Sequence, residues 1–306
     1  MPTDLPAFDP GLPAFDPGLP VGIVGAGVMG TKVAWACARV GLATRLFDAQ
    51  EGKAQASLDL ALSWSQGQEQ ETVRDNLVAT ASLAEALEGA QLGFENVPER
   101  VNLKQSVHRD MAELLPPSAY LGTNASALMC TPMAEACGEP QRFFALNFSD
   151  PRTSRLVELM TADTAADETI AFAMAWARAI WMVPVRTRKE QLGYSFNRLW
   201  RVIKKETLRQ IAQGHATPED IDRAWMLIFG TPMGPCGLMD EVGLHSVLAI
   251  EKVYHQESAD PSDLPPDFLI KMVEAGELGA ASGSGFYTHP NPEYRKPEFL
   301  EETDES

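Results

Sequence analysis

Cysteine is scarce in this chain of 306 residues, and long apolar runs are missing from it. The four cysteines form no Cys-x-x-Cys pair, which argues against a zinc site or a disulfide framework. We therefore expect no bound metal and reduced, buried thiols at Cys37, Cys130, Cys137 and Cys236. No apolar run approaches the roughly 20 residues that a membrane helix needs, so we expect a cytoplasmic protein without a membrane partner.

Basic residues are also in deficit, because 42 acidic residues face 25 lysines and arginines and give a formal charge of −17. Such a surface repels phosphate backbones and anionic lipids, so nucleic acid is not expected as a partner. A polyphosphate ligand would need a local basic patch to overcome this field. We expect a small-molecule substrate.

Proline is frequent at the beginning of the chain, where residues 5–11 and 12–18 both read Leu-Pro-Ala-Phe-Asp-Pro-Gly. Neither a helix nor a central strand accommodates so much proline. Residues 1–19 are therefore predicted to be a disordered leader. The opposite end, residues 290–306, is polar and acidic and is predicted to be a loose tail.

Between these ends, short apolar runs alternate with helical patterns over residues 20–188. Buried strands are expected at Val21–Val24, Ala43–Phe47, Leu77–Ala79, Leu92–Glu95, Tyr120–Thr123, Arg142–Phe148 and Met182–Arg186. Helices are expected at Gly30–Val40, Glu51–Gln66, Val101–Leu114 and Ala166–Trp181, with a polar stretch over residues 67–71. This order predicts an α/β fold with a Rossmann-type, doubly wound parallel sheet. Residues 189–289 lack strand signals and predict a smaller, all-helical C-terminal domain, beginning with the amphipathic stretch Tyr194–Ile211.

The first predicted strand runs into a Gly-x-Gly-x-x-Gly turn, Gly25–Gly30, which also opens the first predicted helix. In this context the pattern indicates a dinucleotide site. Gly25 permits the tight turn, Gly27 lets a pyrophosphate approach the backbone, and Gly30 allows the helix to pack on the strand. The helix start at Val28 and Met29 offers free N–H groups and a partial positive charge to the phosphates.

An acidic residue follows at the end of the second predicted strand, where Asp48 lies 18 residues beyond Gly30. A carboxylate at this place accepts hydrogen bonds from the adenosine ribose and repels a 2′-phosphate. We therefore predict NAD as the cofactor, in preference to NADP. Arg45 lies close in sequence but need not point at the ribose.

Several further segments resemble the 3-hydroxyacyl-CoA dehydrogenase family in order and spacing, from Val21 to Tyr287. They are Glu95–Glu99, Thr123–Ser126, Phe143–Pro151, Leu156–Glu158, Gly193–Leu199, Thr231–Pro235 and Ser282–Tyr287. The resemblance implies a dinucleotide domain, a helical domain through which two subunits pair as a homodimer, and a substrate site between the domains. Glu95–Lys104 and Arg186–Asp222 are also similar to carnitine dehydrogenases.

The resemblance also implies a catalytic group. Ser126 would bind the substrate oxygen, Glu158 would orient a histidine, and Asn197 would hold the substrate carbonyl. Around the nicotinamide and its ribose it implies Glu95 and Lys104, and it adds Asn124 to the residues that bind the cofactor.

Two departures from the family pattern matter for the chemistry. The histidine position is Asn147, and the interval from there to Glu158 is one residue shorter than usual. An amide cannot take up a proton near neutral pH, and loss of a general base typically costs about 10²–10⁴-fold. In addition, residues 54–73 contain no lysine or arginine where the family clasps the CoA nucleotide. We therefore predict a smaller, non-CoA substrate, as in the carnitine and gulonate dehydrogenases.

The missing base leaves several possibilities open. Glu158 is a candidate base acting through a water molecule, whereas His108 is expected on a solvated helix face. Three functions follow: an NAD-dependent oxidoreductase for a small polar hydroxy or oxo compound, gripped by Ser126, Asn147 and Asn197; an oxidoreductase whose chemistry needs no strong base, such as imine or carbonyl reduction or oxidation of an aldehyde hydrate; and a non-catalytic NAD-binding sensor or scaffold.

Overall fold

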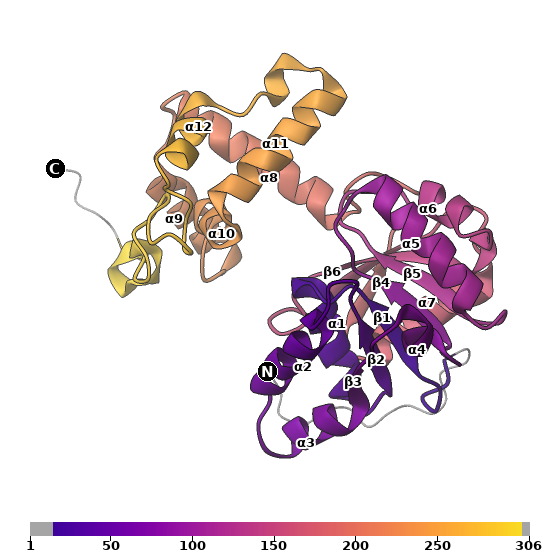
Figure 1. The fold of residues 1–306 in the computed structure, drawn as a ribbon. Coiled ribbons are helices and arrows are strands. Elements are labelled where there is room, and N and C mark those ends of the chain that lie inside the picture. The colour runs from indigo at the N-terminus through magenta and orange to yellow at the C-terminus, as the bar shows by residue number, and fades with distance from the viewer. Residues whose placement is uncertain (1–14, 302–306) are drawn as a thin grey trace. The chain divides into compact units, whose positions relative to one another are not determined.

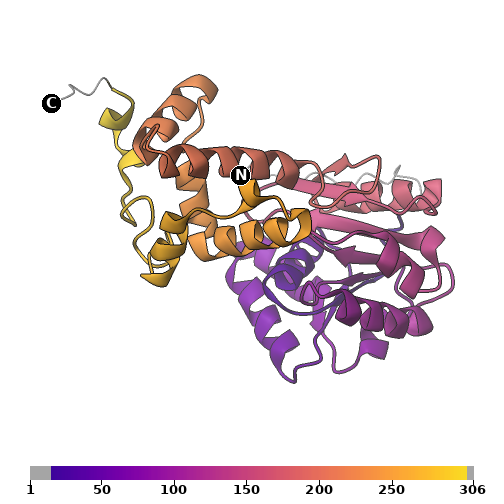
Figure 2. The same ribbon diagram turned by 90° about the horizontal axis from the view of Figure 1, so that it is seen from above.

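The computed structural model describes residues 15–301, and these form two compact units that divide between Phe196 and Asn197. The first unit is a sheet flanked by helices, and the second consists of helices and loops (Figure 1). The same layering of the first unit is visible from above in Figure 2. Among the described residues, no helix combines the length and the apolar character needed to cross a membrane.

The sheet of the first unit has eight strands in the order β3-β2-β1-β4-β5-β6-β7-β8. Their bounds are β1 Val21–Val24, β2 Thr44–Phe47, β3 Leu77–Ala79, β4 Leu92–Glu95, β5 Tyr120–Asn124, β6 Phe143–Phe148, β7 Leu156–Met160 and β8 Val183–Arg186. This topology confirms the predicted Rossmann-type fold. One pair departs from the expected parallel sheet, because β7, which the sequence did not predict as a strand, runs antiparallel to β6.

Helices cover both faces of this sheet and enclose two hydrophobic cores. They are α1 Val28–Ala38, α2 Lys53–Ser63, α3 Gly67–Asn76, α4 Leu83–Leu87, α5 Val101–Leu114, α6 Thr131–Ala136 and α7 Asp167–Ala179, with the 3-10 turn η1 Pro140–Arg142. Successive strand residues point to opposite faces. Ile23 and Phe144 therefore join the core that contains Trp176, whereas Val24 and Phe143 join the other core. Residues 67–71, expected as a polar stretch, instead begin α3.

Both expected loose ends are packed where the structure describes them. Phe15 is 6% exposed and meets Phe172 edge to face, with 5.8 Å between ring centroids. Tyr294 and Phe299 are 3% and 6% exposed and belong to the core of the second unit. Residues 15–19 therefore depart from the predicted disordered leader, and residues 290–301 from the predicted loose tail, because each segment places an aromatic side chain in a core. The remaining residues, 1–14 and 302–306, lie outside the described part of the chain.

The second unit confirms the predicted helical domain. Its helices are α8 Phe196–Ala212, α9 Pro218–Phe229, α10 Pro235–Val242, α11 Leu244–Ser258 and α12 Asp267–Glu274, with 3-10 turns η2 Pro261–Asp263, η3 Glu293–Arg295 and η4 Pro297–Leu300. Thr217 caps α9, since its side chain accepts a hydrogen bond from the N–H of Asp220.

Candidate active site

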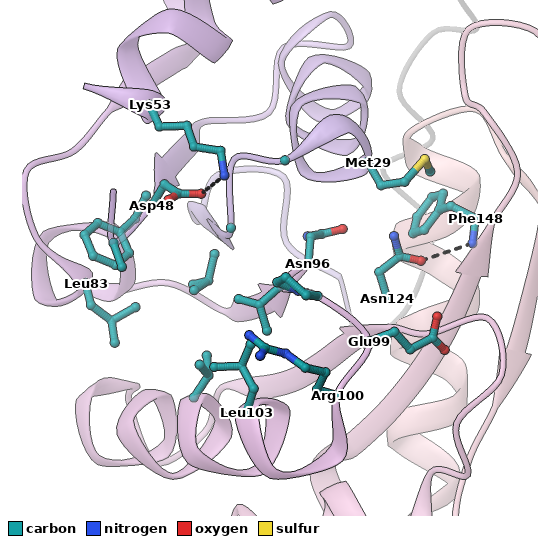
Figure 3. A pocket seen from close by; sticks show the side chains of 18 of the residues that line it. Met29, Asp48, Lys53, Leu83, Asn96, Glu99, Arg100, Leu103, Asn124 and Phe148 are labelled. Carbon is teal, nitrogen blue, oxygen red and sulfur yellow. Dashed lines mark hydrogen bonds and ion pairs between the residues drawn. The ribbon is translucent and has the colours of Figure 1, made fainter. Parts of the chain in front are cut away.

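A cavity of about 620 Å³ opens at the carboxyl ends of β1, β2, β4, β5 and β6, where doubly wound sheets bind their ligands. The β1–α1 turn, the residue after β2, and the loops after β4 and β5 all contribute to its wall. Figure 3 shows Asp48, Lys53 and Leu83 at one end of this cavity. Asn124, Phe148 and Glu99 lie at the other end. Ser126 and Asn147 line the same cavity.

The glycine turn has the geometry that a dinucleotide needs. Gly25 has φ +94°, and a Cβ on Gly30 would stand 1.8 Å from the carbonyl oxygen of Gly25. A Cβ on Gly27 would meet no atom within 4 Å, so this glycine leaves open space where a ligand can approach the backbone. Gly27 caps α1 without any side-chain hydrogen bond to the helix N-terminus. The N–H groups around Val28 and Met29 are therefore available to an anion.

Asp48 lies beside this turn and is tied to it. One carboxylate oxygen accepts the N–H of Ala26 at 2.7 Å and forms an ion pair with Lys53 at 3.2 Å. The sequence reasoning did not identify Lys53 as part of the site, although it lies only five positions after Asp48. Arg45 donates to the carbonyls of Glu85 and Glu88 and so points away from a ribose held by Asp48.

Glu95 and Lys104, expected near the nicotinamide, do not line the cavity. Both are 0% exposed, and the Lys104 ammonium lies 2.8 and 3.0 Å from the two carboxylate oxygens of Glu95. The cluster fixes two cavity loops, because Glu95 accepts the N–H of Val97 and Lys104 donates to the carbonyl of Asn124. Both residues therefore support the cavity wall from behind.

His108 belongs to this buried cluster, and the expectation of a solvated position is wrong. Its Nε2 lies 3.0 Å from Glu95, and its ring is 0% exposed. Burial and the charge of Lys104 together lower the pKa of His108 more than the Glu95 carboxylate raises it. Burial also favours a raised pKa for Glu95, but the hydrogen bond from His108 and the charge of Lys104 outweigh it and lower that pKa.

Ser126 is held by a residue that the sequence reasoning missed. Its hydroxyl donates to one carboxylate oxygen of Glu99 at 2.6 Å. The other oxygen of Glu99 accepts the N–H groups of Ser126, Ala127 and Leu128. Glu99 lies four positions after the last residue of β4, in the segment Glu95–Glu99, so its place in the loop after a central strand was the available signal.

Asn147 and Glu158 face each other across the antiparallel pair β6–β7. The amide nitrogen of Asn147 donates to Glu158 at 3.2 Å. The second oxygen of Glu158 accepts the N–H groups of Ser195 and Phe196, each at 2.9 Å. Glu158 is 1% exposed, and three donors occupy its carboxylate. Asn197 belongs to the second unit, so its role toward the substrate stays a prediction.

This fold and cavity define an NAD-binding oxidoreductase of the Rossmann class. Residues 20–191 match the 3-hydroxyacyl-CoA dehydrogenase NAD binding domain, and residues 193–289 match the C-terminal domain of the same enzymes. The chain therefore belongs to the 3-hydroxyacyl-CoA dehydrogenase family. Family, enzyme class and NAD as cofactor were all predicted from the sequence and are confirmed.

Individual relatives differ in the substrates that they are named for. The chain is 32% identical to a 3-hydroxybutyryl-CoA dehydrogenase of Mycobacterium tuberculosis, over 88% of this chain and 98% of the relative. It is 26% identical to 5-formyl-3-hydroxy-2-methylpyridine 4-carboxylate 5-dehydrogenase of Mesorhizobium japonicum, over 90% and 92%. A solved structure of a diketoreductase that acts on dicarbonyl compounds superposes with a TM-score of 0.81 at 27% identity, covering 89% of this chain and 99% of that one.

Proposed function

We propose that this enzyme transfers a hydride between NAD(H) and a small polar hydroxy or oxo compound that carries no CoA. The observation that carries the proposal is the hydrogen bond from the Asn147 amide to Glu158 in the cavity wall. The resemblance puts a proton-accepting histidine at this position. An amide can donate and accept hydrogen bonds but cannot act as a base, so proton transfer must take another route than in CoA-dependent relatives.

The charge of the α2–α3 segment supports a substrate without CoA. Residues 53–76 carry four acidic side chains against two basic ones, Lys53 and Arg74. Lys53 is already paired with Asp48. A phosphorylated adenosine approaching this segment would therefore meet repulsion. The named substrates of the Mesorhizobium relative and of the diketoreductase are also free compounds.

Those two names also favour the variant of the proposal in which no strong base is needed. An aldehyde hydrate is more acidic than a simple alcohol, and the reduction of a dicarbonyl compound needs a proton donor for the product oxygen instead of a base. The site residues proposed for either reaction are Ser126, Asn147 and Asn197 on the substrate. The turn Gly25–Gly30 and Asp48 would hold the cofactor.

Turnover of NAD+ and NADH against a substrate panel tests the proposal. The panel contains 3-hydroxybutyrate, a vicinal amino alcohol, an aromatic aldehyde, a β-diketone and, for comparison, 3-hydroxybutyryl-CoA. We expect one of the free compounds to be turned over faster than the CoA thioester. A preference for 3-hydroxybutyryl-CoA, or tight NADH binding without any turnover, would overturn it. The Asn147→His variant separates the two reaction types: activity rises if a base is needed and stays unchanged if it is not.

The quaternary structure and location belong to the same proposal. Leu227, Ile228 and Phe229 at the end of α9 are 60, 78 and 61% exposed, an apolar patch of the kind that protein interfaces cover. We propose that two subunits pair through this helical unit in the cytoplasm. Light scattering is expected to give the mass of a dimer, and Ile228→Glu to give that of a monomer; a monomeric wild type refutes the pairing.

A further inference from the structure

We propose that Ser126 and Glu99 form a proton relay that replaces the missing imidazole. The inference rests on the proposed function, since it supplies the proton route that the function requires. It starts from the 2.6 Å hydrogen bond in which the Ser126 hydroxyl donates to a Glu99 carboxylate oxygen. Both side chains line the cavity, and Figure 3 shows Glu99 at the end that holds Asn124 and Phe148.

The hydrogen-bond directions suit proton removal from an alcohol. A serine hydroxyl has one donor and can accept two hydrogen bonds. Because the donor of Ser126 is directed at Glu99, its oxygen can accept from a substrate hydroxyl. The two carboxylate oxygens of Glu99 have different partners. One accepts the backbone N–H groups of residues 126–128, and the other accepts the hydroxyl of Ser126. The loop thus fixes Glu99 relative to Ser126 without using the oxygen that takes the proton.

Glu158, Asp48 and His108 are less suited to this task. Glu158 is 1% exposed and accepts three hydrogen bonds, so a proton placed there has no route to water. Asp48 lies at the opposite end of the cavity and is paired with Lys53 (Figure 3). His108 is buried behind the wall against Glu95. Glu99, by contrast, is exposed and can exchange a proton with solvent.

The step balances in protons and electrons. In the oxidative direction the carbon–hydrogen bond of the substrate breaks, and its hydride reduces NAD+ to NADH. The hydroxyl proton of the substrate moves to Ser126 Oγ as the serine proton moves to Glu99. The Glu99 carboxyl then releases that proton to water. In the reductive direction the same protons move in the opposite order, so the relay serves a carbonyl substrate equally well.

Glu99→Gln, Glu99→Asp and Ser126→Ala test the relay, with Glu113→Gln as the matched control. Glu113 is an exposed carboxylate on α5 that does not line the cavity. The reaction is followed with the panel compound that the wild type turns over fastest. We expect kcat to fall about 10²-fold or more in Glu99→Gln and in Ser126→Ala, because either change breaks the proton path. The double variant should lose no more than the worse single one, as expected for residues acting as a unit.

Three readouts separate a relay from a merely structural role. The dissociation constant of NADH, measured by fluorescence, should change by no more than about threefold in all variants. This is well below the tenfold change that corresponds to about 1.4 kcal/mol of binding free energy. Glu99→Asp should recover part of kcat, and the solvent deuterium isotope effect should change in Glu99→Gln. Glu99→Gln that binds NADH and keeps wild-type kcat overturns the relay alone. A wild type without turnover on the whole panel overturns the proposed function and the relay with it.

Discussion

The buried charge cluster behind the cavity allows a prediction whose size follows from its contacts. Lys104 is 0% exposed, and its ammonium contacts Glu95, the Thr123 hydroxyl at 3.2 Å and the Asn124 carbonyl at 2.8 Å. Lys104→Met keeps an apolar stem of similar length but removes the charge. Glu95 then loses the cation closest to it inside the protein.

Removal of one partner from a buried ion pair costs about 3–5 kcal/mol, because the other charge is left uncompensated. Glu95 keeps the Thr123 hydroxyl at 2.7 Å, the N–H of Val97 and the ring of His108. We therefore expect the lower part of that range, about 3 kcal/mol. The matched control is Lys32→Met, whose ion pair with Asp150 is partly solvated. Such a pair contributes about 0–1 kcal/mol.

The loss of unfolding free energy in Lys104→Met should depend on pH, because the protonation of His108 changes when Lys104 is removed. In the wild type the pKa of His108 is lowered from 6.5. The folded state therefore binds fewer protons than the unfolded state below that pH, and stability falls as the pH drops. Lys104→Met removes one of the two influences that lower the pKa of His108, so this pKa rises and the folded variant binds the proton at a higher pH than the wild type does. The difference in stability between wild type and variant should shrink as the pH falls.

Urea unfolding near pH 8 and near pH 5.5 measures both effects. We expect Lys104→Met to lose clearly more free energy of unfolding than Lys32→Met near pH 8, and part of that excess to disappear near pH 5.5. The reasoning is refuted if the two variants lose equal amounts near pH 8. The role assigned to His108 is refuted if the excess loss of Lys104→Met over Lys32→Met is as large near pH 5.5 as near pH 8. Adding His108→Phe to Lys104→Met should abolish the recovery in acid.

Three further perturbations address the cofactor and the chain ends. Asp48→Asn removes the charge that repels a 2′-phosphate and releases Lys53, so the preference for NADH over NADPH should fall about tenfold or more, as fluorescence titration would measure. In Gly30→Ala the new Cβ would stand 1.8 Å from the Gly25 carbonyl oxygen, so the turn must shift and NADH binding should be lost even where the protein stays folded by circular dichroism. Phe299→Ala empties a buried site of the second unit and should lower its unfolding free energy by about 3 kcal/mol; an unchanged urea midpoint would support a loose tail after all.

The dinucleotide half of the fold was predictable because its signals are local. The apolar run before Gly25, the glycines themselves and the acid at the end of the next strand all lie within 28 residues, from Val21 to Asp48. Each follows from the backbone requirements of one βαβ unit. The sequence does not predict β7, because an antiparallel strand can follow its neighbour after a short turn, without the intervening helix that marks a parallel strand. Its register nevertheless explains why Asn147 and Glu158 are neighbours.

The sequence does not predict the buried cluster, because a histidine next to Arg109 in a helix indicates a solvated face. Lys104, His108 and Met111 follow one another at intervals of four and three and are the buried residues of α5. That spacing places all three on one helix face. A face that contains Met111 is an inward face, so the pattern held the information that His108 is buried. The spacing does not identify the partner of Lys104 and His108, because Glu95 belongs to β4 and contacts α5 only in the folded chain.

Glu158 illustrates why a retained residue need not retain its chemical role. The resemblance gives it the task of orienting a histidine, and this chain has Asn147 at that place. Its carboxylate nevertheless accepts the N–H groups of Ser195 and Phe196, where α8 begins. Negative charge at a helix start is favourable because of the helix dipole and the unpaired N–H groups there. The structure thus supplies a reason to keep Glu158 that is independent of any base, and its presence cannot be taken as evidence that it handles the proton.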